Sequence, residues 1–165
     1  DRGGSATMSG FGSKRKERFL GALPSASLEG DGDLLTEKCK FNFAYFTVQS
    51  AGQNFDDWEG DDLCKLFHCL KEYSKFTLDH WSREGVLKIY RDFPKNSEFT
   101  HPPYIPHEVW WGRFRLASAV RLAGFVVPGA FHGKEHPKTK RLFDCNTFYV
   151  TFLDANHLFY KTEKK

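Results

Sequence analysis

The chain has 165 residues and a mass of 19.0 kDa, which suits one domain of ordinary size and is too little for two. Apolar side chains make up 40% of it, charged side chains 27%, and the mean hydropathy is −0.54, a balance typical of a soluble globular protein rather than a disordered one. The sequence contains neither an apolar run of the roughly 18–20 residues that a membrane-spanning helix needs nor a recognisable signal peptide. We therefore expect a cytoplasmic protein with no membrane partner.

Residues 1–33 are predicted to be a flexible leader, because they are rich in glycine, serine and charge and poor in large apolar side chains. Residues 1–7 precede the only methionine, Met8, and are interpreted as a vector remnant. The cluster of basic side chains at residues 14–18 is either a phosphate-binding arm or a solvated part of the leader. Residues 34–165 are expected to form a single domain.

The domain is expected to open with a strand over residues 40–48 (KFNFAYFTV), with Phe41, Phe43 and Tyr45 on one face. A helix is predicted from about residue 57 to 73, capped by a preceding polar residue. The acidic side chains in its first turns suit the positive end of a helix, which accounts for them without a metal. Helical spacing predicts a buried stripe on this helix, made of Leu63, Leu66, Phe67 and Leu70.

The rest of the chain alternates short strands with a proline-rich loop at residues 92–107, which carries His101 and His107. Short helical segments are expected at 77–81 and 108–111. The fold class is predicted to be α+β, with an antiparallel sheet of about five or six strands packed on one main helix. The later strands are predicted at residues 86–90, 113–116, 120–127, 147–153 and 158–161.

No metal or cofactor is expected. The pair His132 and His136 is separated by three residues, but Gly133 and Pro137 favour a loop there and nearby lysines would repel a cation. The glycine-rich motifs of nucleotide-binding folds and the serine motif of α/β-hydrolases are also missing from the sequence. None of the cysteines belongs to a C-x-x-C pair, so all are expected to be free thiols in a reducing cytoplasm. They are Cys39, Cys64, Cys69 and Cys145.

Positive charge is concentrated in the second half of the chain. Residues 1–72 carry 9 basic and 12 acidic side chains, whereas residues 73–165 carry 15 basic and 9 acidic ones. A basic half suits a surface that binds the phosphates of a nucleic acid, although a solvated surface can have the same composition. The side chains that we single out as candidates for nucleic-acid binding are Arg113, Arg115, Arg121, Lys134, Lys138, Lys140 and Arg141.

Three of these arginines are predicted to share one face of a hairpin. If residues 117–119 form its loop, Arg115 pairs with Arg121, and Arg113 lies on the same face. Like charges directly opposite each other destabilise a sheet by up to about 1 kcal/mol. Either an acidic neighbour such as Glu108 or Asp144 offsets this repulsion, or a bound phosphate does, since guanidinium groups match phosphate geometry. In this register the core face carries Phe114, Leu116, Val120 and Leu122.

The segments 111–116 (WGRFRL), 120–127 (VRLAGFVV) and 148–154 (FYVTFLD), followed by His157 and Tyr160, resemble the sheet of RelE/HigB-type toxins. The resemblance covers about residues 111–161. Members of that family are small, ribosome-dependent endoribonucleases that cleave messenger RNA, with a helical N-terminal part before an antiparallel sheet. The resemblance therefore implies RNA, which could be ribosome-bound, as substrate and a protein partner such as an antitoxin.

The chemistry that the resemblance implies is metal-independent cleavage, in which the ribose 2′-OH attacks the adjacent phosphate. Candidates for proton transfer are His107, His157 and Tyr160, with the three hairpin arginines as phosphate clamps. The alternative is a non-catalytic protein-interaction module, such as a defence accessory protein or an inhibitor, that binds through an aromatic surface.

Overall fold

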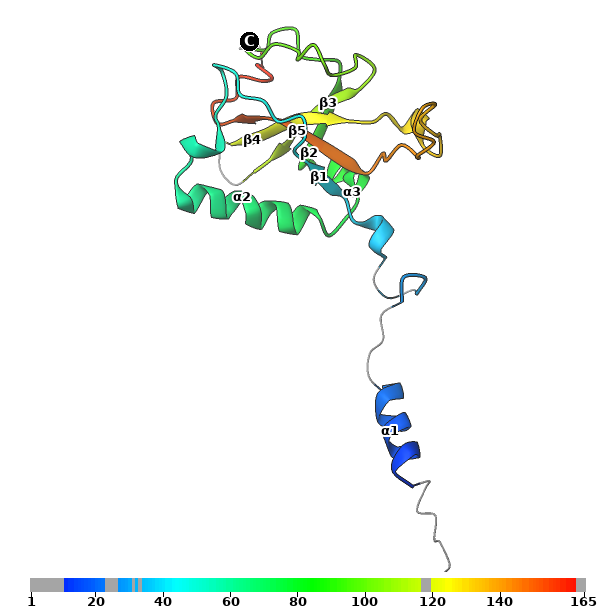
Figure 1. Ribbon diagram of the computed structural model, residues 1–165. Helices are drawn as coiled ribbons and strands as arrows, with labels where there is room; N and C mark the ends of the chain where they lie inside the picture. Colours follow the sequence, from blue (N-terminus) through cyan, green and yellow to red (C-terminus); the bar gives the residue numbers. More distant parts are fainter. Residues whose placement is uncertain (1–10, 23–26, 31, 33, 117–119, 163–165) are drawn as a thin grey trace, which may run out of the picture. The chain divides into compact units, whose positions relative to one another are not determined.

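The computed structural model describes residues 11–22, 27–30, 32, 34–116 and 120–162 (Figure 1). The chain divides into two compact units, residues 1–35 and 36–165. The described part of the first unit contains helix α1 (Phe11–Ala22), which exposes Phe19 and Leu20. This helix lies inside the segment for which we predict a flexible leader, and that flexibility stays a prediction. The suggested vector remnant, residues 1–7, lies outside the described residues.

The second unit is built on a five-stranded sheet with the strand order β1-β5-β4-β3-β2. Three of its neighbouring strand pairs are antiparallel, but β1 runs parallel to β5, so the sheet is mixed. The α+β class is confirmed. The prediction of a wholly antiparallel sheet is wrong at this one edge. The strands are β1 (Lys40–Asn42), β2 (Leu87–Arg91), β3 (Trp110–Arg115), β4 (Arg121–Val126) and β5 (Thr147–Asp154).

Helices α2 (Gly60–Tyr73) and α3 (Leu78–Arg83) lie on one side of this sheet, here called the first face (Figure 1). Leu66 and Leu70 of α2 are buried against it, as predicted. Phe67 is 66% exposed, so its predicted burial is wrong. It follows Leu66 by 100°, which turns its side chain away from the sheet. The buried sheet residues of this face include Phe114, Leu122, Phe148, Val150 and Leu153.

Thr77 caps α3 by accepting a hydrogen bond from the His80 N–H at 3.0 Å. Asn54, a polar residue before the main helix, caps the short 3-10 helix η2 (Phe55–Asp57) instead. Helix α2 starts three residues after η2 ends, and its N-cap Glu59 makes no side-chain capping bond. The remaining 3-10 helices are η1 (Leu35–Glu37) and η3 (Gly129–Phe131).

The strand predicted over residues 40–48 ends at Asn42, because the chain turns there. The Asn42 side chain accepts a hydrogen bond from the Ala44 N–H at 2.9 Å, and the Phe46 N–H donates to the Phe43 carbonyl at 3.0 Å. Phe43 and Phe46 consequently pack on the first face, whereas Tyr45 packs on the opposite side of the sheet. A period of two therefore assigned Tyr45 to the wrong face.

The opposite side of the sheet, the second face, carries its own apolar cluster. Residues 92–109, here called the cover segment, contribute buried Phe99 and Ile105 to it. The Gln49 side chain holds this segment through two 2.7 Å hydrogen bonds with the backbone of Thr100. The sheet supplies Trp111, Ala123, Phe125 and Phe152, and the C-terminal part supplies Phe159.

Two further predictions are wrong. Residues 108–111 do not form a helical turn, because Trp110 and Trp111 already belong to β3 and pair with Val126 and Phe125 of β4. Residues 158–161 do not form a strand. They follow a turn in which His157 has φ of 56°, and Phe159 inserts into the second-face cluster.

Candidate nucleic-acid interface

The predicted register of the arginine hairpin is confirmed. Arg115 pairs with Arg121 and Phe114 with Leu122, and the Leu116 N–H donates to the Val120 carbonyl at 3.1 Å. The loop residues 117–119 lie outside the described residues. Phe114 and Leu122 are fully buried on the first face, so the alternation of a strand directs the arginines to the second face.

The acidic residues proposed to offset these arginines lie elsewhere. Asp144 forms an ion pair with Lys40 at 2.7 Å, and Glu108 lies at the end of the cover segment, just before β3. The acidic neighbour is instead Asp154, which is buried and pairs in register with Arg121. Its two carboxylate oxygens accept the backbone N–H groups of Leu158 and Phe159, each at 2.9 Å. Asp154 therefore stabilises the turn that follows β5, and it also lies opposite Arg121 in the sheet.

The charges of Arg113 and Arg115 also act on Arg121. Burial lowers the pKa of its guanidinium, the charges of Arg113 and Arg115 lower it further, and Asp154 only partly opposes them. An arginine stays protonated at neutral pH despite such a shift. The arrangement therefore favours binding of an anion, which would relieve the repulsion among the three guanidinium groups.

A pocket of about 430 Å³ lies beside Arg113 on the second face. Three segments far apart in the sequence meet in it: β2, β3 and the stretch that follows β5. None of the described residues that line this basic pocket is acidic. They are Lys88, Tyr90, Arg113, His157, Tyr160, Lys161 and Thr162.

Tyr90 contacts three of the other residues that line the basic pocket. Its ring stacks on that of Tyr160 with a centroid distance of 4.1 Å and an interplanar angle of 6°. Its hydroxyl accepts a 2.9 Å hydrogen bond from Nε of Arg113, and Nζ of Lys88 lies 5.7 Å from the ring centroid. Burial raises the pKa of Tyr90, although the charge of Arg113 opposes the shift, so the phenol stays neutral at physiological pH. Tyr90 therefore positions Arg113 and Tyr160 and is not a candidate base.

Sequence reasoning missed Lys88 and Tyr90, although a signal was present. The two residues are separated by one position on β2 and so share a face, and Lys88 lies opposite Arg113 in the register. Pairing the strand at residues 86–90 with that at 113–116 would have placed both beside Arg113. Arg113 also has a buried nitrogen, Nη1, with no hydrogen-bond partner among the described residues. A buried guanidinium nitrogen without an acceptor is rare in folded proteins.

Two of the three predicted proton-transfer residues, His157 and Tyr160, line the basic pocket. The third, His107, does not: its ring stacks on His101 at 4.5 Å, and His101 in turn contacts Trp111 in the second-face cluster. The turn bearing His157 is held by Asp154, as described above. The structure thus brings together His157, Tyr160 and Arg113.

The seven predicted nucleic-acid-binding residues divide into two groups. Lys134, Lys138, Lys140 and Arg141 lie in residues 128–146, here called the basic loop, which connects the end of β4 to the start of β5. Because β4 begins at Arg121, the basic loop lies at the end of the sheet away from the arginines (Figure 1). In this loop, Nδ1 of His136 accepts the N–H groups of Lys138 and Thr139 at 3.1 and 3.2 Å.

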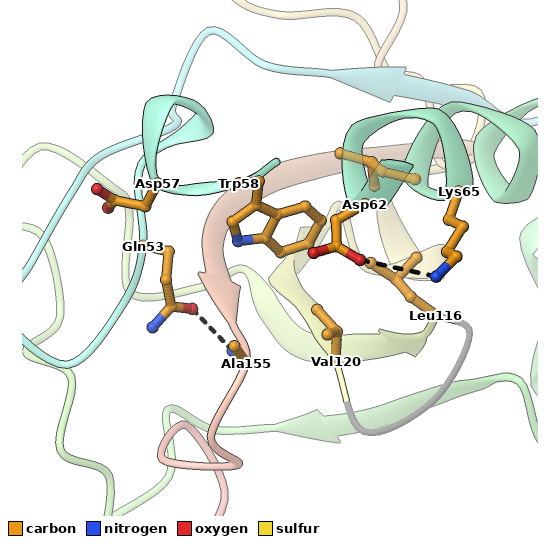
Figure 2. Close-up of a pocket in the computed structure, with 9 residues that line it drawn as sticks. Gln53, Asp57, Trp58, Asp62, Lys65, Leu116, Val120 and Ala155 are labelled. Carbon is orange, nitrogen blue, oxygen red and sulfur yellow. Dashed lines mark hydrogen bonds and ion pairs between the residues drawn. The ribbon is translucent and has the colours of Figure 1, made fainter. Parts of the chain in front are cut away.

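The acidic stretch at residues 56–62 borders a different pocket, of about 380 Å³, shown in Figure 2. Its polar groups serve local structure. The Asp57 carboxylate accepts the Asn54 N–H at 2.8 Å. Asp62 pairs with Lys65 at 3.8 Å, and Gln53 accepts the Ala155 N–H at 2.8 Å (Figure 2). This agrees with the interpretation of the acids as features of a helix start.

The four cysteines are free thiols; Cys39 is buried and Cys64 is exposed. Among the described residues, no three His, Cys, Asp or Glu side chains lie together as they would around a metal ion.

In the described part of the chain, no helix is both long and apolar enough to cross a membrane. Comparisons with protein-family models, with curated proteins and with solved structures find no match to this chain.

Proposed function

We propose that this protein binds RNA through the end of the second face that carries Arg113, Arg115 and Arg121, here called the basic end. The RNA backbone is cleaved in the basic pocket. The observation that carries the proposal is the convergence of Arg113, His157 and Tyr160, with Lys88, in one pocket lined by no carboxylate among the described residues. Lys161 also lines this pocket, in an ion pair with Glu98 of the cover segment. The resemblance to RelE/HigB-type toxins supports the same assignment and extends it to messenger RNA on the ribosome and to an antitoxin partner.

In the proposed reaction, the 2′-oxygen of one ribose forms a bond to the adjacent phosphorus while the bond from phosphorus to the 5′-oxygen breaks. His157 removes the proton of the 2′-OH, and Tyr160 protonates the leaving 5′-oxygen. Arg113 stabilises the negative charge that grows on the phosphate oxygens. The products are a 2′,3′-cyclic phosphate and a 5′-hydroxyl.

RNA binding is tested by fluorescence anisotropy with a labelled 12-nucleotide single-stranded RNA over a range of salt concentrations. The affinity should fall steeply with salt, because bound phosphates release counterions. Arg113→Glu should weaken binding at least tenfold. Arg83→Glu is the matched control, because Arg83 lies on the exposed part of α3, in an ion pair with Asp79 at 3.2 Å. Undetectable RNA affinity at about 50 mM salt, or equal loss in both variants, would reject the proposal.

Cleavage is tested by the products formed from the same RNA in the presence of a chelator. His157→Ala should lower the cleavage rate about 10²- to 10⁴-fold while leaving RNA affinity nearly unchanged, since proton transfer acts in the transition state. Tyr160→Phe tests the proposed acid separately, because it keeps the stacking on Tyr90 and removes only the hydroxyl. If RNA binds but is never cut, a binding function alone remains; if RNA does not bind, the alternative of a protein-interaction module is favoured.

A further inference from the structure

At the other end of the second face, next to the basic loop, lies an apolar groove of about 380 Å³. One wall is formed by Tyr45, Phe125 and Tyr149, of which Phe125 and Tyr149 stack at 4.9 Å and 9°. The other wall belongs to the basic loop and contains Phe131 and Phe143, whose ring centroids are 5.1 Å apart. This aromatic groove is distinct from the basic pocket, with which it shares no residue.

The basic loop that forms one wall is an ordered structure. Glu135 and Leu142 form a β-bridge, and the Phe143 N–H donates to the Lys134 carbonyl at 3.0 Å. These bonds hold Phe131, Phe143 and the cations of the loop in one unit. Nζ of Lys134 lies 5.4 Å from the centroid of the Phe131 ring, so a positive charge lies beside the groove itself.

The charges around the groove favour a particular class of ligand. The basic loop carries four exposed cations, Lys134, Lys138, Lys140 and Arg141. It contains two acidic residues, Glu135 and Asp144, of which Asp144 is paired with Lys40 of β1. On the other wall, Glu108 lines the groove and would repel a phosphate. A ligand that fits must therefore present a flat apolar part to the rings and an anion to the loop. An unpaired base with its phosphate has this chemistry, because every base has a π-face that stacks on aromatic side chains.

We propose that the aromatic groove binds an unpaired base of single-stranded RNA, with the neighbouring phosphates on the basic loop. The inference rests on the proposed function, because it assigns a second contact to the same RNA. Arg121 and Val126, at the two ends of β4, are five residues apart, which corresponds to about 17 Å along a strand. An RNA of several nucleotides can thus contact both ends of the face.

The test measures binding of a 12-nucleotide RNA in a His157→Ala background, so that the RNA stays intact. Phe143→Ala should weaken binding about 5- to 100-fold, the equivalent of losing one stacked base. Leu142→Ala is the matched control, because Leu142 is the neighbouring apolar side chain but is 66% exposed and does not line the groove. An RNA that lacks its bases should bind weakly and should be insensitive to Phe143→Ala.

Circular dichroism checks that Phe143→Ala folds, and Phe131→Ala provides an independent variant of the same wall. Lys140→Glu should also weaken binding, whereas Lys71→Glu on α2 should not. If neither phenylalanine matters, or the base-free RNA binds as tightly as the intact one, the inference is overturned. The proposed function still stands if Arg113→Glu weakens binding in that experiment, and both fail if no RNA binds at all.

Discussion

The two faces of the sheet are built from the same strands but differ in what covers them. The first face is apolar along its length and is covered by α2 and α3. The second face is covered by residues 92–109 only over its aromatic part, and beyond that part it presents Arg113, Arg115 and Arg121. Packing against the two helices accounts for the apolar side chains of the first face. The arginines of the second face make no comparable contribution to a core.

This difference separates positions that stabilise the fold from positions available for a ligand. Substitutions on the first face should therefore change the free energy of unfolding, and those at the basic end of the second face should change binding instead. Four predictions test that separation.

Leu66→Ala should lower the free energy of unfolding by about 2–5 kcal/mol, because Leu66 is 2% exposed and its loss leaves a cavity under the sheet. Phe67→Ala, one position further along the same helix, should change it by about 0.5 kcal/mol or less. Urea denaturation of both variants checks this. A larger loss for Phe67→Ala would mean that α2 packs through a different side.

Gly124→Ala should cost about 1–3 kcal/mol, because a Cβ at Gly124 would collide with the carbonyl oxygen of Tyr149 on the neighbouring strand. Gly129→Ala is the control, since a Cβ there meets nothing within 4 Å. Thermal unfolding of the two variants measures the difference. Equal melting temperatures would show that β4 and β5 can separate at this position without cost.

A smaller effect is expected at alkaline pH. Burial raises the pKa of the Cys39 thiol from 9.0 to about 11, with Lys40 opposing the shift. The folded state therefore favours the protonated thiol, so this contribution is present below pH 9 and is lost as the pH rises from 9 toward 11.

The measurement is the denaturation midpoint of the natural chain and of Cys39→Ala at pH 8 and pH 10.5. The difference between the two proteins should shrink at the higher pH. A difference that stays constant would contradict the raised pKa of Cys39.

The smallest change in stability is expected for Arg113→Gln, within about 0.5 kcal/mol of the natural chain. Losing the hydrogen bond to Tyr90 is offset by removing repulsion with Arg121. The same variant should lose RNA affinity. Urea denaturation measures its stability, and fluorescence anisotropy measures its RNA affinity. A loss of several kcal/mol would make Arg113 a structural residue and would remove the contrast between the faces.

Local patterns predicted the parts of the site that lie within one hairpin. The register of β3 and β4, and the common face of Arg113, Arg115 and Arg121, follow from a three-residue loop and strand alternation, and the register is confirmed. The sequence suggested Glu108 or Asp144 as examples of an acidic neighbour, whereas the residue in register with Arg121 is Asp154. That position depends on the pairing of β4 with β5, whose register includes a bulge between Ala123 and Gly124.

The sequence by itself determined which residues are apolar, where the main helix lies, and which hairpin face carries the arginines, because each depends on spacing within a short segment. The tertiary structure alone decided that Tyr90 stacks on Tyr160, that His157 and not His107 lines the same pocket as Arg113, and that the lysines of the basic loop lie at the far end of the sheet. These contacts join strands and turns that are distant along the chain. Their geometry depends on how the strands pair and where the chain turns, and a local period carries no information about either.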